Sequence, residues 1–105
     1  MITRIFILDD SLVFEKMIED ILEESRNLLI PWNFEIIKGL NVMQFVEFVK
    51  NNDIRSSDIF FLDIDLNAYH SGIELGEMLR EKNAKCKIVY LTSHPNKAIA
   101  VINRN

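Results

Sequence analysis

Four short apolar runs, separated by longer amphipathic segments, most constrain the fold of this 105-residue chain. The runs are rich in β-branched and aromatic residues, a composition typical of buried strands. Each intervening segment is long enough to return the chain across a sheet as a helix. This alternation predicts an α/β domain in which a parallel sheet carries helices on both faces. The four predicted strands are residues 2–8, 34–37, 59–64 and 87–91.

The segments between the strands carry ordinary helix signals. Asp10 or Ser11 is expected to cap the first helix, and Asn41 to cap the second. The third helix is expected at about residues 73–82, and Pro95 suits the first turn of a fourth.

The first helix is expected to turn an apolar stripe toward the core. The stripe consists of Phe14, Met17, Ile18, Ile21, Leu22, Leu28 and Leu29. The charged residues that lie largely off the stripe are Glu15, Lys16, Glu19, Asp20, Glu23 and Glu24. We expect the four acids at positions 19, 20, 23 and 24 to form a solvated face, or alternatively a docking surface for a basic partner.

The overall composition indicates a single globular domain over residues 1–105, with 49% hydrophobic and 27% charged residues. A net charge of −4 and the absence of a basic run argue against direct contact between this segment and nucleic acid. No stretch approaches the ~20 apolar residues of a membrane span, so a cytoplasmic location without membrane contact is expected. Cys86 is the one cysteine, and it is expected to be a buried core residue.

Acidic residues follow two of the predicted strands. Asp9 and Asp10 come directly after the first, and Asp63 ends the apolar part of the third. Since ligands bind at the carboxyl edge of open α/β sheets, these acids are expected to converge on one crevice if the two strands are parallel neighbours. Carboxylates this close repel one another unless a cation compensates, and hard oxygen ligands suit Mg²⁺. Asp63 could then act as a nucleophile that forms an aspartyl phosphate.

Simpler roles stay open for each of these residues. Asp9 or Asp10 could only cap a helix, and Asp63 could be a strand-end turn residue. The side chain of Asp65 is expected to be solvated, while its backbone carbonyl could bind the metal ion. Thr92 ends the fourth strand, where its hydroxyl could contact a phosphoryl oxygen.

This ordered set of residues resembles a response-regulator receiver domain. Within that family, residues 61–66 (FLDIDL), 72–76 (GIELG) and 90–94 (YLTSH) are similar to the LytTR-type regulators of peptide quorum sensing and bacteriocin control. The resemblance covers essentially the whole chain. It implies a flavodoxin-like, doubly wound parallel sheet with strand order 2-1-3-4.

The resemblance also implies the partners and the roles of the site residues. Asp63 would accept phosphate from a sensor histidine kinase, and Thr92 would sense the phosphoryl group. Asp9, Asp10 and Asp63 would hold Mg²⁺, with the Asp65 carbonyl as a further ligand. Such a domain is a signalling receiver rather than an enzyme, and it would control transcription through a downstream LytTR DNA-binding domain.

The chain departs from the receiver pattern at its end. Receivers carry a lysine at the end of a fifth strand, whereas this chain stops at Asn105, inside the predicted fourth helix. The fifth strand and last helix are therefore expected to be missing, which would leave strand 87–91 as an apolar edge. We expect self-association through this strand or the fourth helix.

Three other classes of protein remain open. A haloacid-dehalogenase-like phosphohydrolase also places its nucleophile in an Asp-x-Asp motif, which Asp63 and Asp65 match, although Asp9 and Asp10 would then have no role. A flavodoxin-like nucleotide or flavin module is disfavoured because the acidic first loop lacks glycine. A degenerate receiver would act only as an interaction surface.

Overall fold

A computed structural model describes residues 2–9, 11–26, 33–66, 71–91 and 102–103 of the chain. Strands and helices alternate from the start of the chain to its fourth strand. The elements are β1 (Thr3–Leu8), α1 (Leu12–Arg26), β2 (Phe34–Ile37), α2 (Val42–Asn51), β3 (Ile59–Asp63), α3 (Gly72–Lys82), β4 (Lys87–Leu91) and β5 (Ile102–Asn103).

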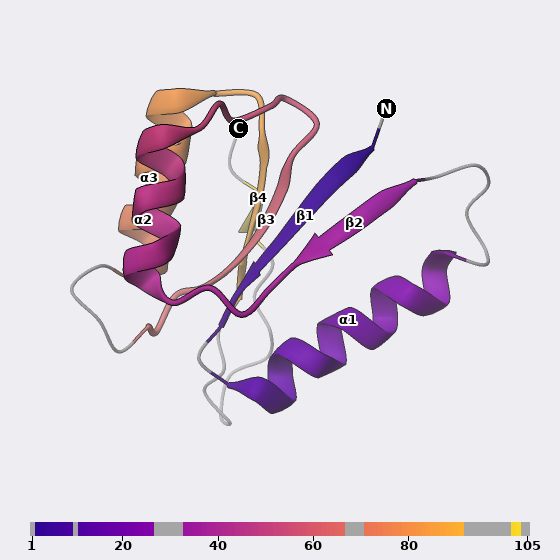
Figure 1. Ribbon diagram of the computed structural model, residues 1–105. Coiled ribbons are helices and arrows are strands. Elements are labelled where there is room, and N and C mark those ends of the chain that lie inside the picture. The colour runs from indigo at the N-terminus through magenta and orange to yellow at the C-terminus, as the bar shows by residue number, and fades with distance from the viewer. Residues whose placement is uncertain (1, 10, 27–32, 67–70, 92–101, 104–105) are drawn as a thin grey trace.

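The first four strands form a parallel sheet in the order β2-β1-β3-β4. Helix α1 lies on one side of this sheet, and α2 and α3 lie together on the other (Figure 1). The predicted α/β class, the parallel sheet and the strand order 2-1-3-4 are confirmed. The bounds of β2 and β4 agree with the predicted strands, and those of β1 and β3 differ by one residue at one end.

The end of the described chain differs from the prediction. Residues 102–103 form β5, a strand antiparallel to β4, where the interior of a fourth helix was expected. The two strands pair at Val89↔Asn103 and Tyr90↔Ile102. The pairing satisfies backbone groups along an edge of β4 that a helix would leave open. Residues 92–101, where the fourth helix was predicted to begin, lie outside the described residues.

The larger core lies between the sheet and the pair α2 and α3. Phe6 and Phe60 stack with their ring centroids 4.6 Å apart, and Phe45 meets Phe60 edge-on at 6.0 Å. From α3, Leu75 and Leu79 add two completely buried side chains to this core. These apolar contacts fix the two helices against the central strands.

The smaller core lies under α1, where Ile7, Ile18 and Leu91 are buried. Among the described residues of the apolar stripe, the expectation of an inward-facing side chain is wrong for two, since Met17 is 45% exposed and Ile21 61% exposed. Leu28 and Leu29, the last two residues of the predicted stripe, lie outside the described residues. Both line a shallow apolar groove between α1 and the sheet. A straight helix covers only part of a twisted sheet, so the outer side of the stripe stays exposed.

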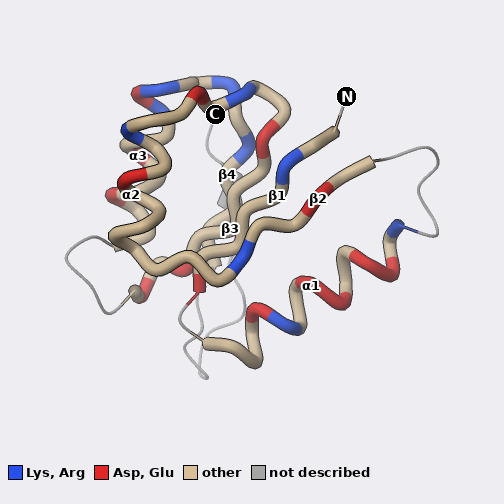
Figure 2. The backbone as a smooth tube through the Cα atoms, viewed as in Figure 1, with Lys and Arg blue, Asp and Glu red and all other residues tan. Residues whose placement is uncertain are grey.

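Acidic residues are concentrated along α1 (Figure 2). Asp20, Glu23 and Glu24 are exposed, as expected of a solvated face. The Glu19 carboxylate lies 2.7 Å from the Lys38 ammonium, and the hydrogen bond from Lys38 lowers the pKa of Glu19.

Side chains satisfy the first N–H groups of each described helix, and the caps predicted at Ser11 and Asn41 are confirmed. At α1 the Ser11 hydroxyl accepts a hydrogen bond from the Phe14 N–H at 3.3 Å. Helices α2 and α3 both begin with a capping box, formed in α2 by Asn41 and Gln44. The start of every helix in the described part of the chain therefore follows the carboxyl edge of the sheet, close to the predicted site.

A buried ion pair lies at the amino edge of the sheet. Arg4 donates from Nε to Asp58 Oδ1 at 2.9 Å and from Nη2 to Asp58 Oδ2 at 2.6 Å. Asp58 is completely buried, and its Oδ2 also accepts the Arg55 N–H at 2.8 Å. This bidentate pair joins the start of β1 to the turn before β3.

Candidate functional site

Strand register places the predicted acids at one edge of the sheet. Leu8 of β1 pairs with Leu62 of β3, so Asp9 and Asp63 occupy equivalent positions just beyond that pair. Asp63 in turn pairs with Leu91 of β4. The two central strands therefore bring Asp9 and Asp63 together at their carboxyl ends, the edge where ligands bind in α/β sheets.

Asp63 is held by backbone contacts on both sides. Its side chain is completely buried, and its Oδ1 accepts a hydrogen bond from the Asp65 N–H at 2.9 Å. The next residue, Ile64, donates its N–H to the Leu91 carbonyl at 2.8 Å. A buried carboxylate is costly, and these contacts give it one defined orientation.

Helix α3 begins directly against the backbone of Asp63. Gly72 donates its N–H to the Ile64 carbonyl at 3.3 Å. A Cβ atom at Gly72 would overlap the carbonyl group of Asp63. Glycine is therefore required here by close packing, and the start of α3 supports the loop that carries Asp63 and Asp65.

Asp9 is half-buried at the end of β1, and its Oδ1 accepts the Ser11 N–H at 2.7 Å. This contact shapes the turn into α1. The side chain of Asp65 is exposed, as expected. Asp10 and Thr92, the other two predicted site residues, lie outside the described residues.

The described acids have the right chemistry for a hard divalent cation, because carboxylate oxygens are the protein ligands of Mg²⁺. Within the described residues, no three His, Cys, Asp or Glu side chains gather closely enough to hold a metal ion. The sequence predicts three carboxylates, and Asp10 is outside the part of the chain that the structure describes. Asp9 and Asp63 fit a site with one or two protein carboxylates, in which water and a phosphate oxygen complete the octahedron.

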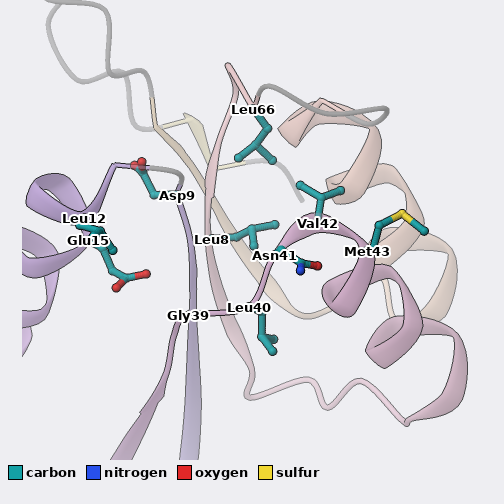
Figure 3. A pocket seen from close by; sticks show the side chains of 10 residues that line it. All are labelled: Leu8, Asp9, Leu12, Glu15, Gly39, Leu40, Asn41, Val42, Met43 and Leu66. Carbon is teal, nitrogen blue, oxygen red and sulfur yellow. The ribbon is translucent and has the colours of Figure 1, made fainter.

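A further acid near this edge was missed from the sequence. Glu15 was expected off the apolar stripe of α1, yet only 8% of its surface is exposed. It follows Leu12 by three residues, so both lie on the side of α1 that faces the end of β1. Glu15 and Asp9 line one pocket together with Leu8 and Leu40 (Figure 3).

Comparisons with known proteins agree with the fold and with a receiver-like domain. No family model matches the chain. The chain is 26% identical over 91 residues to the transcriptional regulatory protein ComA of Bacillus subtilis (strain 168), a match that covers 87% of this chain and 39% of ComA. The chain thus spans about two fifths of the length of this relative. This similarity to a response regulator supports a receiver-like domain.

A solved structure shares the fold. It is described as the yeast Spc42 trimeric coiled coil, amino acids 181–211, fused to another structure. The match has a TM-score of 0.64 and 22% sequence identity, and it covers 89% of this chain and 54% of the other. Among the described helices of this protein, none is both long and apolar enough to cross a membrane.

Proposed function

We propose that this chain is a phosphoacceptor receiver of a two-component signalling system, with Asp63 as the acceptor. The observation that carries the proposal is the register Leu8↔Leu62, which sets Asp9 beside Asp63 at the carboxyl edge. Similarity to a response regulator over 87% of the chain supports the same role.

In this proposal a sensor histidine kinase donates the phosphoryl group. An oxygen of the Asp63 carboxylate attacks phosphorus, an O–P bond forms, and the P–N bond to the kinase histidine breaks. The Asp65 N–H holds Oδ1 of Asp63 at 2.9 Å and so fixes the rotation of the nucleophile. Thr92 directly follows Leu91, the partner of Asp63 in β4, and its hydroxyl is proposed to contact the transferred group.

Asp9, Asp10 and Asp63 are the proposed Mg²⁺ ligands, together with the backbone carbonyl of Asp65. When bound, the ion would neutralise charge on the phosphoryl oxygens. Asp9 is suited to this role because its Oδ1 is already oriented by the Ser11 N–H at 2.7 Å.

Incubation with Mg²⁺ and acetyl phosphate, followed by intact-mass spectrometry, tests the proposal. One phosphoryl adduct is expected, and Asp63→Asn should abolish it. Asp65→Asn is the matched control, because it removes an exposed carboxylate of the same loop and keeps the backbone carbonyl. Continuous phosphate release without an adduct would indicate a phosphohydrolase instead. Neither adduct nor Mg²⁺ binding would leave only an interaction module.

The wider setting is also proposed. ComA is a transcriptional regulatory protein, and we propose that this chain serves transcriptional control in the cytoplasm through other parts of a longer regulator. Residues 61–66, 72–76 and 90–94 support the LytTR type and peptide quorum sensing as the finer assignment. The net charge of −4 supports an indirect role in DNA binding. Transfer of phosphate from LytTR-pathway kinases, compared with kinases of other pathways, tests the assignment.

Self-association through β4 is a separate proposal. Strand β4 is the outermost of the four parallel strands, and within the described residues β5 pairs with it at Val89 and Tyr90. Such an edge is able to pair with a second chain. Light scattering over a range of concentrations should show a dimer, and a monomer at the highest concentration would refute the proposal. The predicted contact through a fourth helix falls on residues outside the described part.

A further inference from the structure

A pocket of about 410 Å³ lies beside the acidic edge, a size suited to a small ligand. It is formed by the end of β1, the first turn of α1 and the loop into α2 (Figure 3). Its lining is mostly aliphatic, with Leu8, Leu40, Val42 and Leu66 on the inner side. The proposed acceptor Asp63 is not among its lining residues.

The side chain of Glu15 is buried against this pocket. Only 8% of the Glu15 surface is exposed. Figure 3 shows its carboxylate on the pocket side of α1. Within the residues that the structure describes, its carboxylate has neither a hydrogen-bond partner nor an ion-pair partner. Glu15 is not among the described side chains with an enclosed, unpaired oxygen, so its carboxylate is reachable from the pocket and available to a cation.

The nearby lysines are already engaged elsewhere. The Lys38 ammonium lies 2.7 Å from Glu19, and the Lys16 ammonium lies 3.0 Å from Asp20. Neither lysine lines the pocket, whereas Asp9 adds a second carboxylate to it. The lining therefore attracts a positive charge and repels an anion.

The rim of the pocket is apolar and open to solvent. Leu12 is 77% exposed and Met43 60% exposed, and both border the pocket. We propose that the pocket binds an organic cation, with an ammonium or guanidinium head at Glu15 and an apolar body against Leu12 and Met43. A free amine and the side chain of a lysine or arginine from a partner protein share this chemistry. The pocket shares Asp9 with the proposed Mg²⁺ site, whereas Glu15, its proposed contact to the cation, has no part in phosphate acceptance by Asp63.

Three probes of equal chain length separate charge from apolar contact: hexylamine, 1-hexanol and hexanoate. Titrations of the full chain are followed by amide chemical shifts at Glu15, Gly39 and Asn41, with EDTA present to remove divalent ions. The amine, protonated at pH 7 like a lysine side chain, should bind about tenfold more tightly than the alcohol. Hexanoate should bind least. Equal affinities of amine and alcohol, or shifts confined to other parts of the molecule, would overturn the proposal.

Matched variants assign the charge preference to one residue. Glu15→Gln should equalise the affinities of amine and alcohol, whereas Glu24→Gln, an equal charge change at an exposed position of α1, should preserve the preference. Leu12→Gln, at a site too exposed to matter for folding, should weaken both ligands. An amine that loses binding in Asp63→Asn but not in Glu15→Gln would lie at the acidic edge and would refute the assignment.

Two peptides then separate the sources of the cation. Acetyl-Leu-Lys-Leu-amide is compared with hexylamine, and the norleucine analogue of the peptide controls for apolar contact. A peptide that binds more tightly than hexylamine supports a partner side chain as the ligand, and the reverse order supports a free amine. Equal affinity of the lysine and norleucine peptides would contradict recognition of a cation.

Discussion

The backbone of Gly72, at the start of α3, packs directly on the carbonyl group of Asp63 at the end of β3. A methyl group at Gly72 would overlap that carbonyl, so Gly72→Ala must displace either the helix or the strand end. We expect it to lower the free energy of unfolding by about 1–3 kcal/mol and to slow formation of the proposed phosphoryl adduct. Urea unfolding and intact-mass spectrometry measure the two effects.

Gly39 offers the control for this substitution. Its φ is 81°, and nothing lies within 4 Å of a Cβ atom placed there. Asn tolerates this left-handed conformation, so Gly39→Asn should cost less than about 1 kcal/mol. Equal losses at Gly39 and Gly72 would argue against close packing as the cause.

Gly76 and Tyr90 form a second close contact, in which a Cβ atom on α3 would overlap the tyrosine hydroxyl. Gly76→Ala should destabilise the protein by about 1–3 kcal/mol. Removal of the hydroxyl in Tyr90→Phe makes part of the required space. The double variant should therefore be more stable than the sum of the single effects predicts, as measured by a double-mutant cycle in urea. Strict additivity would show that the two residues do not interact.

Removal of Arg4 should be strongly destabilising. Arg4→Met leaves Asp58 completely buried without its cation, and the expected loss is about 3 kcal/mol of unfolding free energy. Addition of Asp58→Asn should recover part of that loss, because the uncompensated charge is then gone. Arg55→Met is the control, since the Arg55 side chain is exposed and only its backbone N–H contacts Asp58. Thermal and urea unfolding compare the four proteins.

Cys86 should make stability depend on pH in the alkaline range. Burial raises the pKa of its thiol above the ordinary value of 9.0, and its Sγ donates to the Asn83 carbonyl at 3.3 Å. The unfolded chain then loses this proton at a lower pH than the folded chain. Stability is complete below pH 9 and falls as the pH rises, by at most about 1.4 kcal/mol per pH unit.

Cys86→Ala isolates the contribution of the thiol from those of other alkaline groups. The difference in unfolding free energy between the wild type and this variant should shrink as the pH rises from 8 to 10. Iodoacetamide should also alkylate the native thiol at least ~100-fold more slowly than the unfolded one. A difference that grows with pH would contradict the expected sign.

Sequence patterns predicted the sheet because each strand run is locally distinct. Parallel pairing then follows from the helices between the runs, and the positions of Asp9 and Asp63 follow from where two of those runs end. The prediction of a fourth helix is wrong at residues 102–103, which pair with the edge of β4 instead. This pairing is a long-range contact, and such contacts override the local sequence pattern.

Two buried charges were not predicted, for different reasons. No sequence pattern singled out Asp58, although an Arg at position 4 and an Asp just before β3 become neighbours once the register Ile5↔Ile59 is known. Glu15 was placed off the apolar stripe because helical periodicity describes one helix and not the pocket that Glu15 lines together with the loop between β2 and α2. Neither contact has a local signature in the sequence.

Strand β1 carries a stabilising ion pair at one end and a candidate site residue at the other. Arg4 anchors one end through Asp58, and Asp9 stands at the other end, five residues and about 16 Å away. Substitutions at such a distance usually have additive effects. The fold can therefore be stabilised at its amino edge without altering the acids at the opposite edge, so stability and the proposed chemistry of these acids are free to evolve at different rates.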